Sequence, residues 1–182
     1  MASAVLETPS IPAPIPAPAV HSGRQRRSQP ITNRVRRDGK FFRLGADKFF
    51  VKGLTYGPFA PNAEGDPLPT PAHTRKDFEQ IIEMGANCVR IYHVPPKWFL
   101  ELAQEMGIKI FLDVAWAKNL TFVGDEDVAR QAHDAVRHAA RECGNHPAVF
   151  AISVVNEIPP DLVRFMGKAR VEGFIEIGRA HV

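Results

Sequence analysis

Strand-like and helix-like segments alternate between residues 49 and 155, and this alternation restricts the possible folds more than any other feature of the sequence. Runs rich in β-branched and aromatic residues fit strands, whereas the segments between them repeat apolar residues every three or four positions, as amphipathic helices do. The expected strands are 49–54, 87–92, 108–114 and 148–155, and the expected helices are 74–84, 96–106 and 125–143. Strands that alternate with helices predict an α/β fold with parallel strands and right-handed crossovers.

Two observations favour a barrel over an open, doubly wound sheet. The first strand is not followed by the glycine-rich phosphate turn of dinucleotide-binding sheets. Polar residues instead follow successive strands: Arg90 and His93, Asp113 and Trp116, Asn156 and Glu157. Functional groups at the C-terminal ends of several strands are typical of a TIM (β/α)8 barrel. Because a whole barrel needs roughly 250 residues, we predict the N-terminal half of a barrel, and therefore a truncated fragment.

The first 37 residues predict a disordered tail. Six of the sixteen prolines fall within the first thirty residues, and residues 11–20 favour a solvated polyproline II conformation. Seven lysines and arginines stand in residues 1–40 against two acidic residues, so the net charge of +3 originates in the tail. The basic run 24–37 either keeps the tail soluble or contacts nucleic acid or an anionic membrane surface. No aromatic residue is interleaved with these arginines, which disfavours single-stranded nucleic acid.

Ordered structure is expected from about Asp38. Residues 40–44 and 48–53 predict a short β-hairpin. The hairpin leads into the partial barrel, and the predicted domain covers residues 38–175. Residues 176–182 look like the translation of a sequencing-library adapter, and we expect them to be an artefact. The sequence contains no run of about 18 apolar residues, so no membrane span is predicted. No cleavable signal peptide is evident, and two cysteines do not form a disulfide scaffold.

Three motifs follow one another at barrel spacing. They are residues 50–56 (FVKGLTY), 85–93 (GANCVRIYH) and 145–157 (NHPAVFAISVVNE). Together they resemble the retaining glycoside hydrolases of clan A, nearest to family two, the β-galactosidase and β-glucuronidase type, and similar also to family five and the exo-β-1,3-glucanase-like barrels. The resemblance covers about residues 48–175. It implies an enzyme that hydrolyses or transfers β-linked glycosyl units without a metal or organic cofactor, with carbohydrate and not nucleic acid as its partner.

Asn156 and Glu157 form the candidate catalytic pair. Glycosidic cleavage needs one carboxyl to protonate the leaving oxygen and a second to attack the sugar or activate water. Glu157 is the candidate general acid/base, because burial at the end of an apolar strand would raise its pKa and keep it protonated. By the family pattern, Asn156 would bind the sugar 2-hydroxyl, and the nucleophilic glutamate would follow a seventh strand outside this chain. The alternative is that the Asn-Glu pair only begins a loop before Pro159.

Arg90 is a further candidate for the substrate site. Alternation along its strand places Arg90 on the face opposite Val89 and Ile91, so one set points into the barrel and the other toward the helices. In the resembling families this arginine pairs with the nucleophilic carboxylate. A salt bridge to Asp113 of the next strand is the alternative.

Three more residues are candidates for sugar binding. His93 either lines the wall of the sugar site or is a loop residue held by a hydrogen bond. Tyr56 and Trp116 either stack against a sugar face or serve as ordinary core aromatics.

A second class of function also fits the sequence. A non-catalytic carbohydrate-binding or interaction module would bind sugar at the barrel mouth and use the tail to tether itself to a larger protein. A downstream strand that ends in glutamate would favour the enzyme. The sequence does not indicate the sugar, the linkage, the compartment or the oligomeric state.

Overall fold

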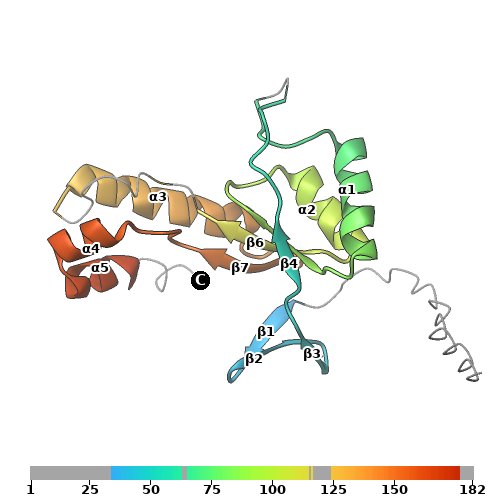
Figure 1. Ribbon diagram of the computed structural model, residues 1–182, viewed down its shortest axis with the longest axis horizontal. Coiled ribbons are helices and arrows are strands. Elements are labelled where there is room, and N and C mark those ends of the chain that lie inside the picture. The colour runs from blue at the N-terminus through green and yellow to red at the C-terminus, as the bar shows by residue number, and fades with distance from the viewer. Residues whose placement is uncertain (1–33, 63–64, 115, 117–123, 177–182) are drawn as a thin grey trace, which may run out of the picture.

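The computed structural model describes residues 34–62, 65–114, 116 and 124–176, in which a three-stranded antiparallel sheet precedes a four-stranded parallel sheet (Figure 1). The antiparallel sheet consists of β1 (Val35–Asp38), β2 (Phe41–Leu44) and β3 (Asp47–Phe49). The parallel sheet consists of β4 (Gly53–Thr55), β5 (Cys88–Ile91), β6 (Lys109–Asp113) and β7 (Val149–Ser153). The helices are α1 (Pro71–Glu83), α2 (Lys97–Met106), α3 (Glu126–Cys143), α4 (Pro160–Met166) and α5 (Lys168–Ile175).

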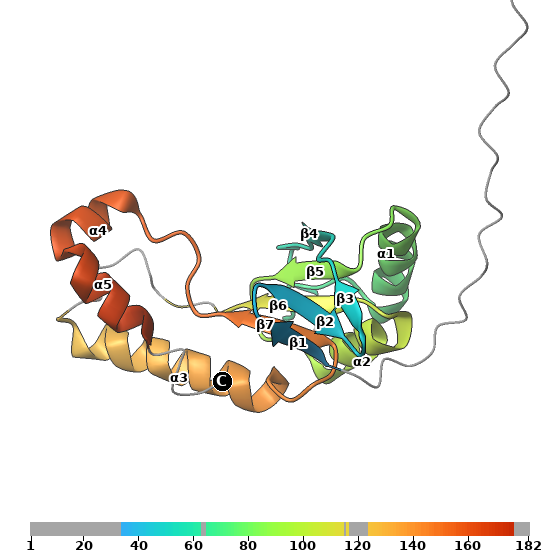
Figure 2. The same cartoon turned by 90° about the horizontal axis from the view of Figure 1, so that it is seen from below.

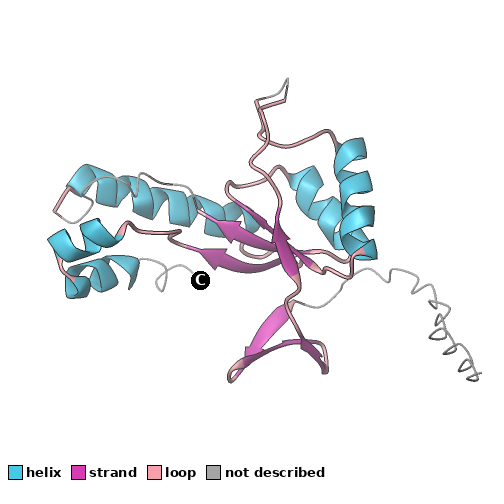
Figure 3. Cartoon of the chain, in the orientation of Figure 1, coloured by secondary structure: helices cyan, strands magenta, loops and turns pink. Residues whose placement is uncertain are grey.

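The parallel sheet has the strand order β4-β5-β6-β7, with helices in the connections between strands (Figure 3). This confirms the predicted α/β class and the parallel pairing. The sheet is not closed into a barrel within the described residues, because β4 and β7 each pair with a single neighbour. Both strands therefore present an unpaired edge, which proteins usually cover.

The hydrophobic core lies between the parallel sheet and its helices. One face of the sheet contributes Val89, Ile91, Ile110 and Leu112, all fully buried. They pack in one cluster with residues of α1, α2 and α3 that include Phe78, Phe99 and Val136. Alternation then places the next residues of β5 and β6, such as Arg90, on the opposite face. The predicted alternation of these strands, with one set of side chains toward the helices, is confirmed.

Local signals set most helix ends. Asp125 caps α3 by accepting hydrogen bonds from the backbone of Asp127 and Val128. Gly107 ends α2 with φ of 81°, a conformation that favours glycine. The predicted start of the first helix at Thr74 is wrong, because α1 begins at Pro71 with Thr70 as its N-cap. Thr74 is instead fully buried within that helix.

The antiparallel sheet starts earlier than expected. Order was predicted from about Asp38, but β1 already pairs with β2 from Val35 onward. The sheet lies beside the parallel sheet (Figure 2), and Phe42 meets Phe150 of β7 with ring centroids 5.3 Å apart. Phe49 adds a second contact to the same ring at 6.1 Å. The remainder of the predicted tail, residues 1–33, and the predicted artefact from residue 177 lie outside the described residues.

Helices α4 and α5 form a smaller unit against the N-terminal part of α3 (Figures 1 and 2). Val128, Met166 and Val171 are its buried residues. Strand β7 is only half-buried beyond Val149. No helix in the described ranges is both long and apolar enough to cross a membrane.

Lys109 is a buried cation at the start of β6. Its residue surface is fully buried, and its Nζ donates a hydrogen bond to the carbonyl oxygen of Pro147 at 2.7 Å. Burial lowers the pKa of Lys109 to about 8 from its usual 10.5, and the positive charge of Arg34 lowers it further. The folded state therefore binds this proton more weakly than the unfolded chain does.

The buried lysine makes a prediction about stability and pH. Below pH 8 both states are protonated, whereas between pH 8 and 10.5 only the unfolded chain retains the proton, so stability should rise with pH. Relative to Lys109→Met, wild type should gain up to about 3 kcal/mol of unfolding free energy over this interval. Denaturant unfolding of both proteins across this pH range measures the difference. A difference that stays constant with pH would contradict the burial of a charged Lys109.

Candidate functional site

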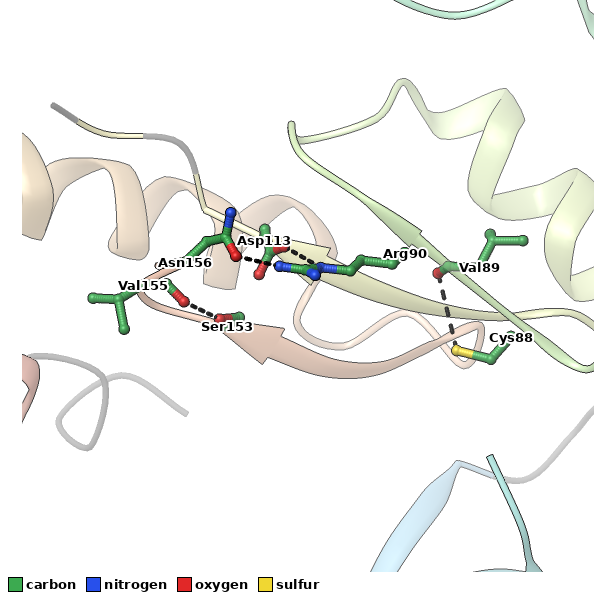
Figure 4. Close-up of polar contacts among 7 residues, drawn as sticks. All are labelled: Cys88, Val89, Arg90, Asp113, Ser153, Val155 and Asn156. Carbon is green, nitrogen blue, oxygen red and sulfur yellow. Dashed lines mark hydrogen bonds and ion pairs between the residues drawn. The ribbon is translucent and has the colours of Figure 1, made fainter. Parts of the chain in front are cut away.

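Arg90, Asp113 and Asn156 meet at the C-terminal ends of the parallel strands (Figure 4), which form the functional edge of the sheet. Arg90 lies in β5, Asp113 ends β6, and Asn156 follows β7. The Nε of Arg90 donates to Oδ2 of Asp113 at 2.5 Å, and its Nη2 donates to Oδ1 of Asn156 at 2.5 Å. Parallel pairing produces this cluster, because the carboxyl ends of parallel strands lie at the same edge of a sheet.

The Arg90–Asp113 salt bridge is largely removed from water. The Asp113 side chain is 4% exposed and that of Arg90 is 32% exposed. The hydrogen bond to Asp113 is the main reason why the pKa of Arg90 is raised above its usual value, with a smaller contribution in the same direction from Glu157. Of the two partners that the sequence left open for Arg90, the structure contains the salt bridge to Asp113.

Glu157 follows Asn156 directly and has an unusual backbone conformation. Its φ is 52°, and it is the one non-glycine residue at positive φ in the part of the chain that the structure describes. Such conformations are uncommon for residues with a side chain and cluster at functional sites. Glu157 is exposed, so the burial that the sequence predicted for it is wrong here. Among the described residues, β7 is the last strand of the parallel sheet and has no neighbour on its outer side.

His93 and Trp116 follow the ends of β5 and β6, as the strand-end pattern predicted. His93 is half-buried, and its Nε2 has no hydrogen-bond partner among the described residues. Burial lowers the pKa of His93, which favours the neutral ring, although Asp66 opposes the effect. The Nε1 of Trp116 donates to the carbonyl oxygen of Val154 at 2.7 Å, and its ring lies 5.4 Å from that of Phe174. Trp116 therefore packs between the segment after β7 and α5.

Tyr56 belongs to the core and not to the cluster at the sheet edge. Its side chain is packed against the rings of Phe59, Phe78 and Phe99. The residue is 6% exposed, and its hydroxyl donates to Oδ2 of Asp77 at 2.6 Å. Burial, and then the hydrogen bond to Asp77, raise the pKa of Tyr56. Of its two predicted roles, the structure supports that of a core aromatic.

An open cavity of about 300 Å³ lies on the face of the parallel sheet opposite the helices. Its lining includes Thr55 and Arg90 near the functional edge, and Cys88, Phe111 and Phe150 farther in. Burial raises the pKa of the Cys88 thiol to about 11, so the thiol stays protonated at neutral pH. No group of three or more potential metal-binding side chains occurs within the described ranges.

Asp113 is the residue of this cluster that the predicted site did not include. Its place at the end of the third predicted strand was recognised, but its predicted role was limited to an alternative partner of Arg90. In the structure Asp113 pairs with Ser153 in the register of β6 and β7, three residues before Asn156. Burial of its carboxylate depends on tertiary packing and could not be read from spacing.

Solved structures with a similar fold include bacterial β-glucuronidases. A β-glucuronidase from Ruminococcus gnavus matches 82% of this chain with a TM-score of 0.63 at 19% identity, and the match spans 26% of that protein. The Bifidobacterium dentium enzyme matches 82% with a TM-score of 0.63 at 21% identity, over 24% of its length. Bacteroides uniformis β-glucuronidase 2 matches 81% with a TM-score of 0.56 at 23% identity, over 18% of its length. The chain therefore spans about a quarter or less of these proteins and shares their fold.

The sequence itself defines the class more closely, as a glycoside hydrolase. The profile of glycoside hydrolase family 72, described as glucanosyltransferase, matches residues 24–139. This is more than half of the chain, and the chain belongs to this glucanosyltransferase family. The match includes Arg90 and Asp113 but ends before Asn156 and Glu157. The predicted glycoside hydrolase resemblance is confirmed at this level, and the family found is the glucanosyltransferase one, where family two was predicted to be nearest. No curated protein sequence matches the chain.

The position of Tyr56 gives a prediction that separates core from site. Tyr56→Phe removes the hydrogen bond to the Asp77 carboxylate, which should lower the unfolding free energy by about 1.5–3 kcal/mol. Tyr92→Phe is the matched control, because the Tyr92 hydroxyl has no hydrogen bond among the described residues. Denaturant unfolding measures both. Equal stability losses in the two variants would show that the Tyr56 hydroxyl does not stabilise the core.

Proposed function

We propose that the chain is the N-terminal half of a (β/α)8 barrel in a retaining enzyme that transfers or hydrolyses β-linked glucan. The single observation that carries the proposal is the group at the sheet edge: Arg90 holds Asn156, and Glu157 follows it in a constrained backbone conformation. Membership of the glucanosyltransferase family supports a glucan as the substrate. Hydrolysis of the same bond is the outcome when water replaces the sugar acceptor.

Glu157 is the proposed general acid/base. In the first step its carboxylic acid would protonate the glycosidic oxygen as the bond to the anomeric carbon breaks, while a second carboxylate attacks that carbon. In the second step the Glu157 carboxylate would remove a proton from the acceptor hydroxyl, which displaces the second carboxylate from the sugar. Asn156 would bind the 2-hydroxyl of the same sugar. Exposure of Glu157 in this chain leaves it open to both the donor and the acceptor.

The second carboxylate is proposed to come from a strand beyond β7. The open edges of β4 and β7 would pair with the remaining strands of the barrel. The alignment with the Ruminococcus gnavus β-glucuronidase, which spans about a quarter of the length of that protein, agrees with this arrangement. The cavity bordered by Arg90 and Phe111 would then become the barrel interior. Within this proposal, the chain alone should turn over no β-glucan, because it lacks the nucleophile. Of the predicted tail, we propose residues 1–33, which precede β1, as dispensable, and we propose residues 176–182 as an artefact.

The roles proposed for the other site residues are limited by their contacts. His93 is the better candidate for a wall of the sugar site, because its Nε2 has no partner among the described residues. Trp116 and Tyr56 are each held by a hydrogen bond inside the protein. Neither is proposed as a stacking platform.

In the complete enzyme, Glu157→Gln should slow turnover of a β-gluco-oligosaccharide donor by about 10²–10⁴-fold, the contribution of a positioned general acid. An aryl β-glucoside with an activated leaving group should lose less rate in the first step, because its departure needs little protonation. Azide should restore part of the rate by attacking the glycosyl-enzyme in place of a base-activated acceptor. Steady-state kinetics with both donors, with and without azide, provide the measurement.

Glu172→Gln is the matched control for this substitution. Glu172 lies in α5, where it pairs with Lys168 at 3.5 Å on the surface, and its neutralisation should leave turnover unchanged. Product chains longer than the donor would identify transfer. If Glu157→Gln slows both donors equally and azide has no effect, Glu157 is not the acid/base. Binding of the oligosaccharide by wild type without any turnover would favour the non-catalytic module instead.

A further inference from the structure

We propose that Asp113 is a positioning residue, which acts through Arg90 to fix the carboxamide of Asn156 with its NH2 group toward the sugar. The inference rests on the function proposed above and adds to it the mechanism by which the site recognises a hydroxyl. Asp113 itself is not proposed to touch the substrate.

The three side chains form one hydrogen-bonded relay, which joins β5, the end of β6 and the segment after β7. Arg90 in the middle donates to Asp113 through Nε and to Asn156 through Nη2, each at 2.5 Å. Asp113 is the most buried of the three, at 3% exposure, and Asn156 is half-buried at the edge. The relay therefore runs from a buried anchor toward the exposed end of the sheet, where Glu157 lies.

The chemistry of the guanidinium determines which way Asn156 faces. A guanidinium has five N–H donors and no acceptor, so the atom of Asn156 that receives its hydrogen bond is the amide oxygen. The NH2 group of Asn156 consequently points away from Arg90, as Figure 4 shows. In this orientation Asn156 offers donors to a substrate, and the sugar oxygen that it contacts must accept.

Asp113 is what fixes the guanidinium in place. The rings of Tyr92 and Phe111 lie 5.0 and 5.9 Å from the centre of the Arg90 guanidinium, and these contacts restrict its position without determining its rotation. The hydrogen bond at Nε determines the rotation, because the planar guanidinium has a fixed donor geometry. The second oxygen of Asp113, Oδ1, is buried and has no hydrogen-bond partner among the described residues. Arg90 is thus the cation that compensates this carboxylate.

The test uses the complete enzyme with two donors, an aryl β-glucoside and its 2-deoxy analogue. The variants are Asp113→Asn, Arg90→Lys, Asn156→Ala and the double variant Asp113→Asn/Asn156→Ala. Asp113→Asn preserves volume and an acceptor for Nε, but it removes the charge, and Arg90→Lys keeps the charge without the planar fork. Asp134→Asn is the matched control, since Asp134 forms a comparable but exposed salt bridge with Arg137 in α3.

Each single variant of the relay should lower kcat/KM for the 2-hydroxy donor by about 10²-fold, mostly through kcat, because hydrogen bonds to the 2-hydroxyl strengthen in the transition state. The same variants should change kcat/KM of the 2-deoxy donor far less. The double variant should lose no more than Asn156→Ala alone. Additive losses, or equal losses on the two donors, would show that Asp113 is only structural.

A second measurement does not depend on turnover. In the free enzyme, the side-chain NH2 signals of Asn156, identified by their absence in Asn156→Ala, should shift in Asp113→Asn and in Arg90→Lys and stay unchanged in Asp134→Asn. Unchanged signals in Asp113→Asn would overturn the relay. A wild type that turns over no β-glucan or β-glucoside, but whose Asn156 signals respond as described, would instead reject the proposed function and retain the relay.

Discussion

The parallel pairing of β5, β6 and β7 is the constraint on which the candidate site depends. Its register places Arg90 opposite Phe111 and Asp113 opposite Ser153, so the polar residues reach the same edge from successive strands. The opposite face of β5 and β6 is apolar and fully buried against the helices. One register therefore fixes both the hydrophobic core and the polar cluster, and a slip of one residue would exchange the two faces.

Arg90 forms hydrogen bonds both to the buried Asp113 and to the half-buried Asn156. A buried carboxylate is costly unless it is paired, and Arg90 compensates the nearly buried Asp113 at 2.5 Å. At the other end of the sheet face that carries Arg90, the contacts are apolar. There the rings of Phe42, Phe49 and Phe111 contact the ring of Phe150. An apolar layer and a charged layer thus share one face. Only the charged layer lies beside Asn156 and Glu157.

The sequence predicted the elements whose signals are local. Strands β5 and β6 and helix α3 with its Asp125 cap follow directly from apolar periodicity and capping. Strand β1 was missed because its residues, Val35–Asp38, continue an arginine-rich segment and become a strand only by pairing with β2. Two partners were predicted for Arg90, Asp113 and the nucleophilic carboxylate of a later strand. Only the distance between the Arg90 and Asp113 side chains, which lie on neighbouring strands, identifies Asp113 as the partner. The exposure of Glu157 likewise depends on what covers β7, which no local pattern encodes.

The most direct test of this account is a crystal structure of the complete enzyme carrying Glu157→Gln with a bound β-gluco-oligosaccharide. The account predicts that the side chain at position 157 lies within hydrogen-bond distance of the glycosidic oxygen. It further predicts that the Asn156 NH2 group donates to the 2-hydroxyl of the adjoining sugar, while Arg90 holds the Asn156 oxygen as it does here. An oligosaccharide bound away from this edge of the sheet, with position 157 remote from any glycosidic oxygen, would contradict it.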